Sequence, residues 1–368
     1  MFVKESIIYC KKYGYFNEPS SLLLNLSKSF AIFTKTNKME STGIQITFFQ
    51  HIKSLLPEHI SLVDAIADIL NISNDSAYRR IRGEKPISLE EMQKLAAHYK
   101  ISLDQFMHLQ SDSFLFSGKL INASDHNYEN WEESLLQLLQ FASSFQKKHI
   151  TYLAKDVPLP QQFMVPELAA FKSFYFRKSI LNYEELKDKK FSLNNIQNRH
   201  FDISKKIAEL YNQIESTDIW NTESINSTIR QIEYYRDVNL FEKEDEIKSL
   251  YDAVFKLIDH LEKQSELGLK FSMNESPKSD AASFHLYNNE LDLGDNTVLF
   301  ELDNLKITIL NHNIINFIST HDEMFNNYTY EALQNILKKS SSLSVNSEKE
   351  RARFFSQIRY TIKKASRV

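Results

Sequence analysis

Residues 61–106 read SLVDAIADILNISNDSAYRRIRGEKPISLEEMQKLAAHYKISLDQF, and this stretch decides the fold of the first part of the chain. It contains three helix-start signals, in each of which a Ser is followed three residues later by an acidic or amide side chain: Ser61 with Asp64, Ser88 with Glu91, and Ser102 with Gln105. A Ser at a helix start accepts a hydrogen bond from a free backbone N–H, and the later side chain can return one. The stretch therefore predicts a bundle of four short helices.

The second of these helices is short and almost wholly polar. It is expected from about Asn74 to Arg82, and Gly83, which tolerates positive φ, ends it. Only Ala77 and Ile81 are available for the core. Packing alone explains such a helix poorly. A helix presented to the major groove of DNA explains it well, because its basic side chains would reach bases and phosphates.

The segment resembles a helix-turn-helix domain of the Cro/repressor, or Xre-like, class over about residues 44–108. The resemblance is carried by these stretches: Ile66-Ala67-Asp68-Ile69-Leu70-Asn71-Ile72-Ser73, Asn74 to Gly83, Ile87 to Glu91, and Ile101 to Asp104. The run from Tyr78 to Gly83 is closer to the BetR-like variant of bacterial regulators. Two positions depart from the class. Asn71 replaces the usual turn Gly, although Asn tolerates the left-handed conformation, and Ile81 takes a buried position that normally falls one residue earlier.

The resemblance implies a sequence-specific, DNA-binding transcriptional regulator that binds double-stranded DNA as a homodimer, with an unidentified effector or protein partner. The expected DNA-binding residues are Ser73, Asn74, Asp75, Ser76, Tyr78, Arg79, Arg80, Arg82 and Lys85, of which Arg79 and Arg82 are the strongest candidates. The alternative is a protein-interaction scaffold that uses the helix-turn-helix as a docking module.

Composition limits the remaining classes. The chain has 368 residues, 42% of them hydrophobic, which is enough for two or three domains with substantial cores. Only 6 Gly and 7 Pro argue for long helices. The net charge of −4 means that any DNA binding must be local. One cysteine excludes an internal disulfide, and no apolar run is long enough to span a membrane, so we expect a cytoplasmic protein.

We predict a mainly α protein: a helix-turn-helix bundle followed by a large helical C-terminal region with a small antiparallel β element. The predicted segments are an extension over 1–38, a DNA-binding domain over 39–110, a linker over 111–130, a helical domain over 131–271, and an α+β segment over 284–368. Met39 stands just before the first predicted helix, so the hypothesis is that it is the true start or that the extension is mobile. Phe114 and Phe116 are expected to dock the linker on a neighbouring domain.

Two amphipathic helices leave a choice between partner binding and internal packing. Residues 242–267 space their apolar side chains by three and four, which predicts either a homodimer seam or packing inside the same bundle. The final helix, expected from Glu348 to Ala365, is basic on one face, which predicts either phosphate contacts or an ordinary solvated face.

The region between them is expected to contain a little β structure. Short strands are predicted over Phe284–Tyr287, Thr297–Leu302 and Lys306–Leu310, with Asp303-Asn304 as a hairpin turn. Helices are predicted over Ile314–Ser319 and Tyr330–Lys339, and residues 149–160 are expected to be an extended connection.

No catalytic motif stands out, so we expect no enzyme activity, no cofactor and no metal. The three histidines of the C-terminal region, His285, His312 and His321, match no metal-ligand spacing. An enzyme of unrecognised type in the region from Phe114 onward is the remaining alternative, and a deep pocket with convergent carboxylates or histidines would favour it.

Overall fold

The computed structural model describes residues 43–57, 59–101, 103–106, 114–121, 127–195, 198–291 and 293–367. The chain divides into two compact units. The described residues of the first unit are 43–53 and 63–99, and the other described residues belong to the second. The predicted extension, with the hypothesis about Met39, and the cap at Ser102 lie outside the described residues.

The first unit is a bundle of short helices: α3 (Gly43–Ser54), α4 (Leu62–Leu70), α5 (Asn74–Ile81) and α6 (Leu89–Tyr99). Apolar side chains from all four are buried, among them Phe48, Phe49, Ile52, Ile66, Leu70, Ala77 and Leu95. The short α7 (Leu103–Phe106), which was expected to close this bundle, falls in the second unit.

The turns of the first unit follow the local signals in the sequence. Asn71 takes the left-handed conformation at φ 54°, and the N–H of Ile72 donates to the Ala67 carbonyl at 3.0 Å, which closes the end of α4. Gly83 follows α5 with φ 76°. Ser88 and Glu91 form the predicted capping box: the Ser88 N–H donates to Glu91 Oε2 at 3.1 Å, and the Glu91 N–H donates to Ser88 Oγ at 3.2 Å.

The prediction of a mainly α protein with a small antiparallel element is wrong, because the second unit is built on a mixed sheet of eight described strands. The strands are β1 (Ser117–Gly118), β2 (Lys148–Leu153), β3 (Glu215–Trp220), β4 (Phe284–Asn288), β5 (Thr297–Leu302), β6 (Leu305–His312), β7 (Asn316–Thr320) and β8 (Ser341–Ser342). Their order is β1-β7-β6-β5-β2-β3-β4-β8. Strands β2, β3 and β4 are parallel, and every other neighbouring pair is antiparallel.

The sheet joins segments that were expected to be separate. Strands β2 and β3 come from the predicted helical domain, whereas β4 to β8 come from the predicted α+β segment. The extended connection expected over 149–160 begins inside β2, and the helix expected over Ile314–Ser319 is β7. The predicted strands agree with β4, β5 and β6, and the Asp303-Asn304 hairpin turn is confirmed by the pairing of Leu302 with Leu305.

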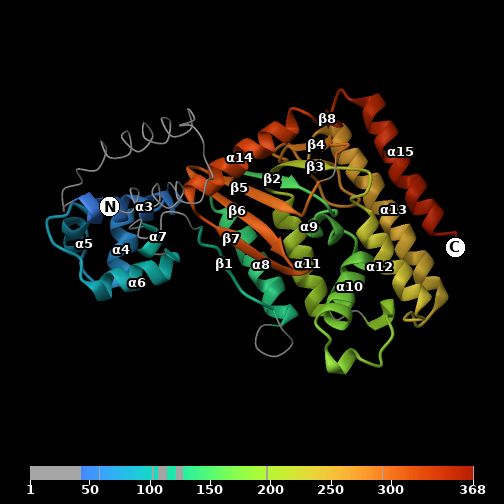
Figure 1. The fold of residues 1–368 in the computed structure, drawn as a ribbon, viewed down its shortest axis with the longest axis horizontal. Coiled ribbons are helices and arrows are strands. Elements are labelled where there is room, and N and C mark those ends of the chain that lie inside the picture. The colour runs from blue at the N-terminus through green and yellow to red at the C-terminus, as the bar shows by residue number, and fades with distance from the viewer. Residues whose placement is uncertain are drawn as a thin grey trace, which may run out of the picture. The chain divides into compact units, whose positions relative to one another are not determined.

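Helices cover both faces of the sheet (Figure 1). They are α8 (Tyr128–Ser143), α9 (Leu159–Gln162), α10 (Pro166–Tyr175), the π-helix Phe176–Ile180, the 3-10 helices Glu184–Leu186 and Leu193–Asn195, α11 (Asn198–Tyr211), α12 (Asn226–Asp237), α13 (Glu244–Leu267), α14 (Glu323–Leu337) and α15 (Glu348–Ala365). Helical crossovers link β2 to β3 and β3 to β4. Such crossovers are nearly always right-handed, and the two crossovers move in the same direction along the sheet, from β2 to β3 to β4. The helices of both crossovers therefore lie on the same face of the sheet. Helix α14 packs on the other face, against β5 and β6.

Side chains of β3 contribute to the cores on both faces of the sheet. Successive strand residues point to opposite faces, so Trp220 is buried with the helices of the large core while Ile219 is buried against Leu333 of α14. Phe114 and Phe116 pack on Phe325 of α14, with ring centroids 5.3 and 5.1 Å apart, which agrees with the predicted docking of this segment.

The apolar seam of α13 is internal. Leu250, Val254, Leu257 and Leu261 are buried in the large core, together with Phe355 and Ile358 of α15, so the internal-packing interpretation is confirmed. Helix α15 has the predicted bounds and apolar face. No helix within the described residues is both long and apolar enough to cross a membrane.

Candidate functional site

Helix α5 is fixed at its start by polar contacts from its own first turn and from α4. The Ser76 N–H donates to Ser73 Oγ at 3.3 Å, so Ser73 is the N-cap. Asn74 Nδ2 donates to Asp64 Oδ1 at 2.8 Å and thereby ties the helix start to α4. These bonds set the direction of α5 but leave Asp75 exposed at its tip.

Arg80 is an internal residue, unlike its basic neighbours. Its side chain is 7% exposed; its Nε donates to Glu91 Oε2 at 2.9 Å, and its Nη2 lies 2.6 Å from Glu91 Oε1. A third bond runs from Nη1 to the Ser76 carbonyl at 3.1 Å. These bonds lower the pKa of the Glu91 carboxyl below its ordinary value, against the opposing effect of partial burial. Arg80 therefore joins α5 to the start of α6.

This arrangement corrects the expected register of α5. Ala77 and Arg80 are its buried residues, while Ile81 is only half-buried. The expected shift of the core position to Ile81 is therefore wrong: an ion-paired Arg stands at the earlier position, where the class usually has an apolar residue.

Gln45 of α3 is a residue that the sequence interpretation missed. Its Nε2 donates to the carbonyls of Arg80 and Lys85 at 2.7 and 2.8 Å, and its Oε1 accepts from the Ile87 N–H at 3.0 Å. One side chain thus fastens the end of α5 and the loop that follows it. No local sequence pattern indicates this role, because the hydrogen-bond partners of Gln45 lie 35 to 42 residues away in the chain.

Seven of the nine predicted contact residues are exposed, and four of these, Tyr78, Arg79, Arg82 and Lys85, belong to the end of the recognition segment. They lie on the last turn of α5 and the loop after it. The Arg82 guanidinium lies 5.5 Å from the centre of the Tyr78 ring. Ser73 and Asn74 are exposed but hydrogen-bonded as described, and Ser76 is half-buried.

Glu84 stands among these basic side chains. Its carboxylate is 3.9 Å from Arg79 Nε and 3.3 Å from Arg82 Nε, and all three side chains are about half exposed. Such exposed pairs are weak, typically 0–1 kcal/mol, and a phosphate can replace the carboxylate. Glu84 therefore lies beside two exposed arginines without fixing their positions strongly.

Part of the chain, including α4, α5 and α6 of the first unit, is similar to a known domain family. Residues 58–120 match the BetR domain, a family of helix-turn-helix type, and the match begins after α3 and extends through β1. It covers a minor part of the chain and supports a DNA-binding regulatory role at most. No curated protein and no solved structure matches the chain significantly.

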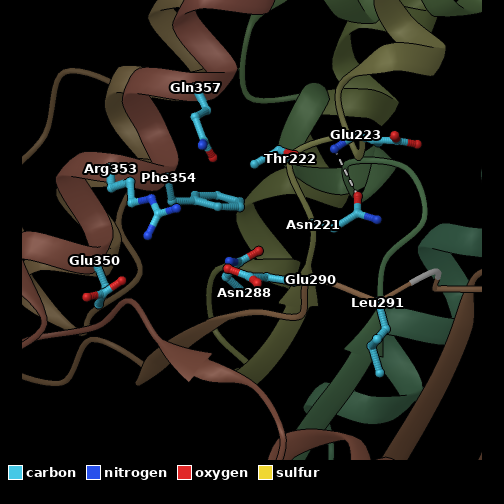
Figure 2. A pocket seen from close by; sticks show the side chains of 10 residues that line it. All are labelled: Asn221, Thr222, Glu223, Asn288, Glu290, Leu291, Glu350, Arg353, Phe354 and Gln357. Atoms are coloured by element: carbon cyan, nitrogen blue, oxygen red, sulfur yellow. Dashed lines mark hydrogen bonds between the residues drawn. The ribbon is translucent and has the colours of Figure 1, made fainter.

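The second unit has a polar groove of about 510 Å³ where the parallel strands β3 and β4 end. The loops that follow these strands line it with Asn221 and Glu290, and α15 supplies further side chains. Figure 2 shows Arg353, Phe354 and Gln357 projecting from α15 toward those loops. The carboxyl ends of parallel strands are the usual ligand-binding edge of an open sheet.

The lining of the groove is polar and carries charges of both signs. Glu223, Glu290 and Glu350 line it, and all three are exposed to solvent. The Asn221 side chain is held by its own loop, since its Oδ1 accepts from the Glu223 N–H at 2.9 Å. The signal that could have revealed this site was a polar residue directly after β3 and directly after β4, and it could not be read while β3 was unrecognised.

The three C-terminal histidines lie on separate segments of the second unit. Within the part of the chain that the structure describes, no group of three His, Cys, Asp or Glu side chains is placed to hold a metal ion. His285 and His312 are exposed on β4 and β6, and His321 is half-buried before α14.

Proposed function

We propose that the chain is a sequence-specific DNA-binding transcriptional regulator, with α5 lying in the major groove. The observation that carries the proposal is the difference in burial among the residues of α5 and the loop after it. Arg80 is used internally, whereas Tyr78, Arg79, Arg82 and Lys85 remain on the surface at its end and in the next loop. Arg79 and Arg82 are the proposed base or phosphate contacts, and Arg80 is left out of the contact set.

The proposal also covers the oligomeric state and the role of the second unit. Recognition helices of this type normally bind two-fold related half-sites, so we propose that the protein binds as a homodimer. The seam of α13 is buried within its own unit and therefore does not supply the dimer contact. The second unit is proposed to sense a ligand or mediate assembly, without catalysis and in the cytoplasm.

The test is selection of binding sites from a random duplex library with the full-length protein. Wild type should enrich one sequence family, and Arg79→Ala/Arg82→Ala should not. A matched control, Lys248→Ala/Lys278→Ala, removes the same charge from exposed positions of the second unit and should enrich the same family as wild type. Enrichment of nothing by wild type would overturn the proposal and favour the scaffold alternative.

A further inference from the structure

A second, apolar cleft of about 170 Å³ lies in the second unit, between α8 and the face of the sheet opposite α14. Its walls include Leu139, Ile150 and Phe300, which are almost fully buried. A cavity of about 150 Å³ with such a lining can hold a benzene ring. The space is therefore large enough for the apolar part of one small ligand.

Polar side chains gather at one end of this cleft, beyond the carboxyl end of β2. The Asp156 N–H donates to Asn296 Oδ1 at 3.1 Å, and the Asn311 N–H donates to the Asn296 carbonyl at 3.4 Å. On the helical side, Lys172 Nζ donates to Thr228 Oγ1 at 3.0 Å and to Gln231 Oε1 at 2.6 Å. The cleft is thus amphipathic along its length, with Val298 and Ile309 leading from the polar end to the deeper apolar walls.

The polar end contains one positive and one negative group that are not paired with each other. Lys172 is 3% exposed, and burial lowers the pKa of its ammonium to about 8, an effect that the neighbouring Asp156 carboxylate partly opposes. Within the described residues, neither side chain forms an ion pair. An ammonium has three N–H donors, and two of those of Lys172 are used by the protein.

A buried indole also lacks a partner beside the same cleft. Trp131 lines it and is 7% exposed, and its Nε1–H has no acceptor within the described residues. Buried polar groups are nearly always hydrogen-bonded. An unpaired donor and an ammonium with a free N–H, both bordering an apolar space, suit a ligand that carries a carboxylate or a carbonyl.

We infer that this cleft binds a free α-amino acid with an apolar side chain. Lys172 Nζ donates to the α-carboxylate, the Asp156 carboxylate accepts from the α-ammonium, and the side chain enters the apolar part of the cleft. A monocarboxylate would leave Asp156 uncompensated, and an amine would leave Lys172 uncompensated. The zwitterion satisfies both charges and fits the size of the space. This names a ligand class for the sensing role proposed above, but it is tested without DNA, so its failure and the failure of DNA binding are distinguishable.

The experiment compares three probes that share one apolar body: leucine, isocaproate without the ammonium, and isoamylamine without the carboxylate. Binding to the full-length protein is measured by calorimetry and by intrinsic tryptophan fluorescence, to which Trp131, one of 2 tryptophans, contributes. Leucine should bind saturably, and each of the other two should bind at least about tenfold more weakly, a loss of about 1.4 kcal/mol.

Variants locate the binding. Lys172→Met and Asp156→Asn should each weaken leucine binding at least about tenfold, and Leu138→Trp, at a half-buried position of the wall, should abolish it. The matched controls Lys155→Met and Asp295→Asn change an exposed ion pair with Nζ–Oδ1 distance 2.9 Å and should bind as wild type. Circular dichroism confirms that each variant is folded. Absence of leucine binding to folded wild type, or isocaproate binding as tight as leucine and unaffected by Asp156→Asn, would overturn the inference.

Discussion

The Arg80 guanidinium and the Glu91 carboxylate form a two-point ion pair across the first unit, with Arg80 Nε 2.9 Å from Glu91 Oε2 and Nη2 2.6 Å from Oε1. The same Glu91 oxygen, Oε2, also accepts the Ser88 N–H that starts α6. One carboxylate therefore joins the end of α5 to the beginning of the next helix. Because the exposed arginines depend on the position of α5, this partly buried pair supports the proposed DNA-binding surface from the inner side of the helix.

Removing Arg80 should destabilise the first unit, since it leaves Glu91 partly buried without its main partner. Arg80→Ala should cost about 2–3 kcal/mol, measured by hydrogen exchange of the amides of α4 to α6. Arg79→Ala, at an exposed neighbouring position, is the matched control and should stay within about 0.5 kcal/mol of wild type. Equal losses from the two substitutions would show that the ion pair is not structural.

The same pair predicts a pH dependence. The pKa of Glu91 in the folded state lies below its ordinary value of 4.5, because Arg80 donates to the ionised form. Folding is therefore favoured by this group above about pH 4.5, and the contribution is lost as the pH falls through the lower folded-state pKa. Stability of α4 to α6 measured between about pH 6 and pH 3 should fall less steeply in Glu91→Gln than in wild type. Identical slopes would contradict the assignment.

The turn between α4 and α5 depends on a left-handed residue. Asn71 has φ 54°, a conformation that costs an ordinary side chain roughly 1–2 kcal/mol. Asn71→Ala should lower the free energy of unfolding of the first unit by about 1 kcal/mol. Asn71→Gly should be close to neutral, because Gly adopts this conformation freely. A loss from Gly as large as that from Ala would mean that the Asn side chain itself stabilises the turn.

Glu84 should oppose DNA binding, because its carboxylate lies between Arg79 and Arg82 on the proposed contact surface. Glu84→Gln should tighten binding to any duplex about two- to fivefold at low salt, as expected for removing an exposed charge pair. The gain should shrink at high salt. Glu223→Gln, which removes an exposed carboxylate of the second unit, should leave affinity unchanged, and an equal gain there would indicate a general charge effect.

Predictability differed between the two units for physical reasons. The helices of the first unit carry their start and stop signals in their own sequence, such as the Ser88 cap and Gly83, so local reasoning located them. Strand β3 could not be recognised in that way. Its residues Ser216, Thr217 and Asp218 are polar yet buried, and only pairing with β2 and β4 makes them a strand.

Only part of the candidate site was predictable from the sequence. The exposed basic residues of α5 followed from its polarity, but the burial of Arg80 depends on Glu91, and the role of Gln45 depends on a loop 40 residues away. The polar groove and the apolar cleft arise from the sheet topology, because their lining residues come from separate strands and helices. A sequence interpretation without that sheet had no means to bring them together.

The most direct test of DNA binding by α5 is a salt titration of affinity for the selected duplex. The logarithm of the binding constant should fall linearly with the logarithm of salt concentration, with a slope set by the number of phosphate contacts. If Arg79 and Arg82 touch phosphates, Arg79→Ala/Arg82→Ala should make the slope shallower by about 1 per lost contact; if they read bases, each should cost about 1–3 kcal/mol on the selected sequence. The Lys248→Ala/Lys278→Ala control should match wild type. A double variant with the affinity, slope and selectivity of wild type would contradict the account.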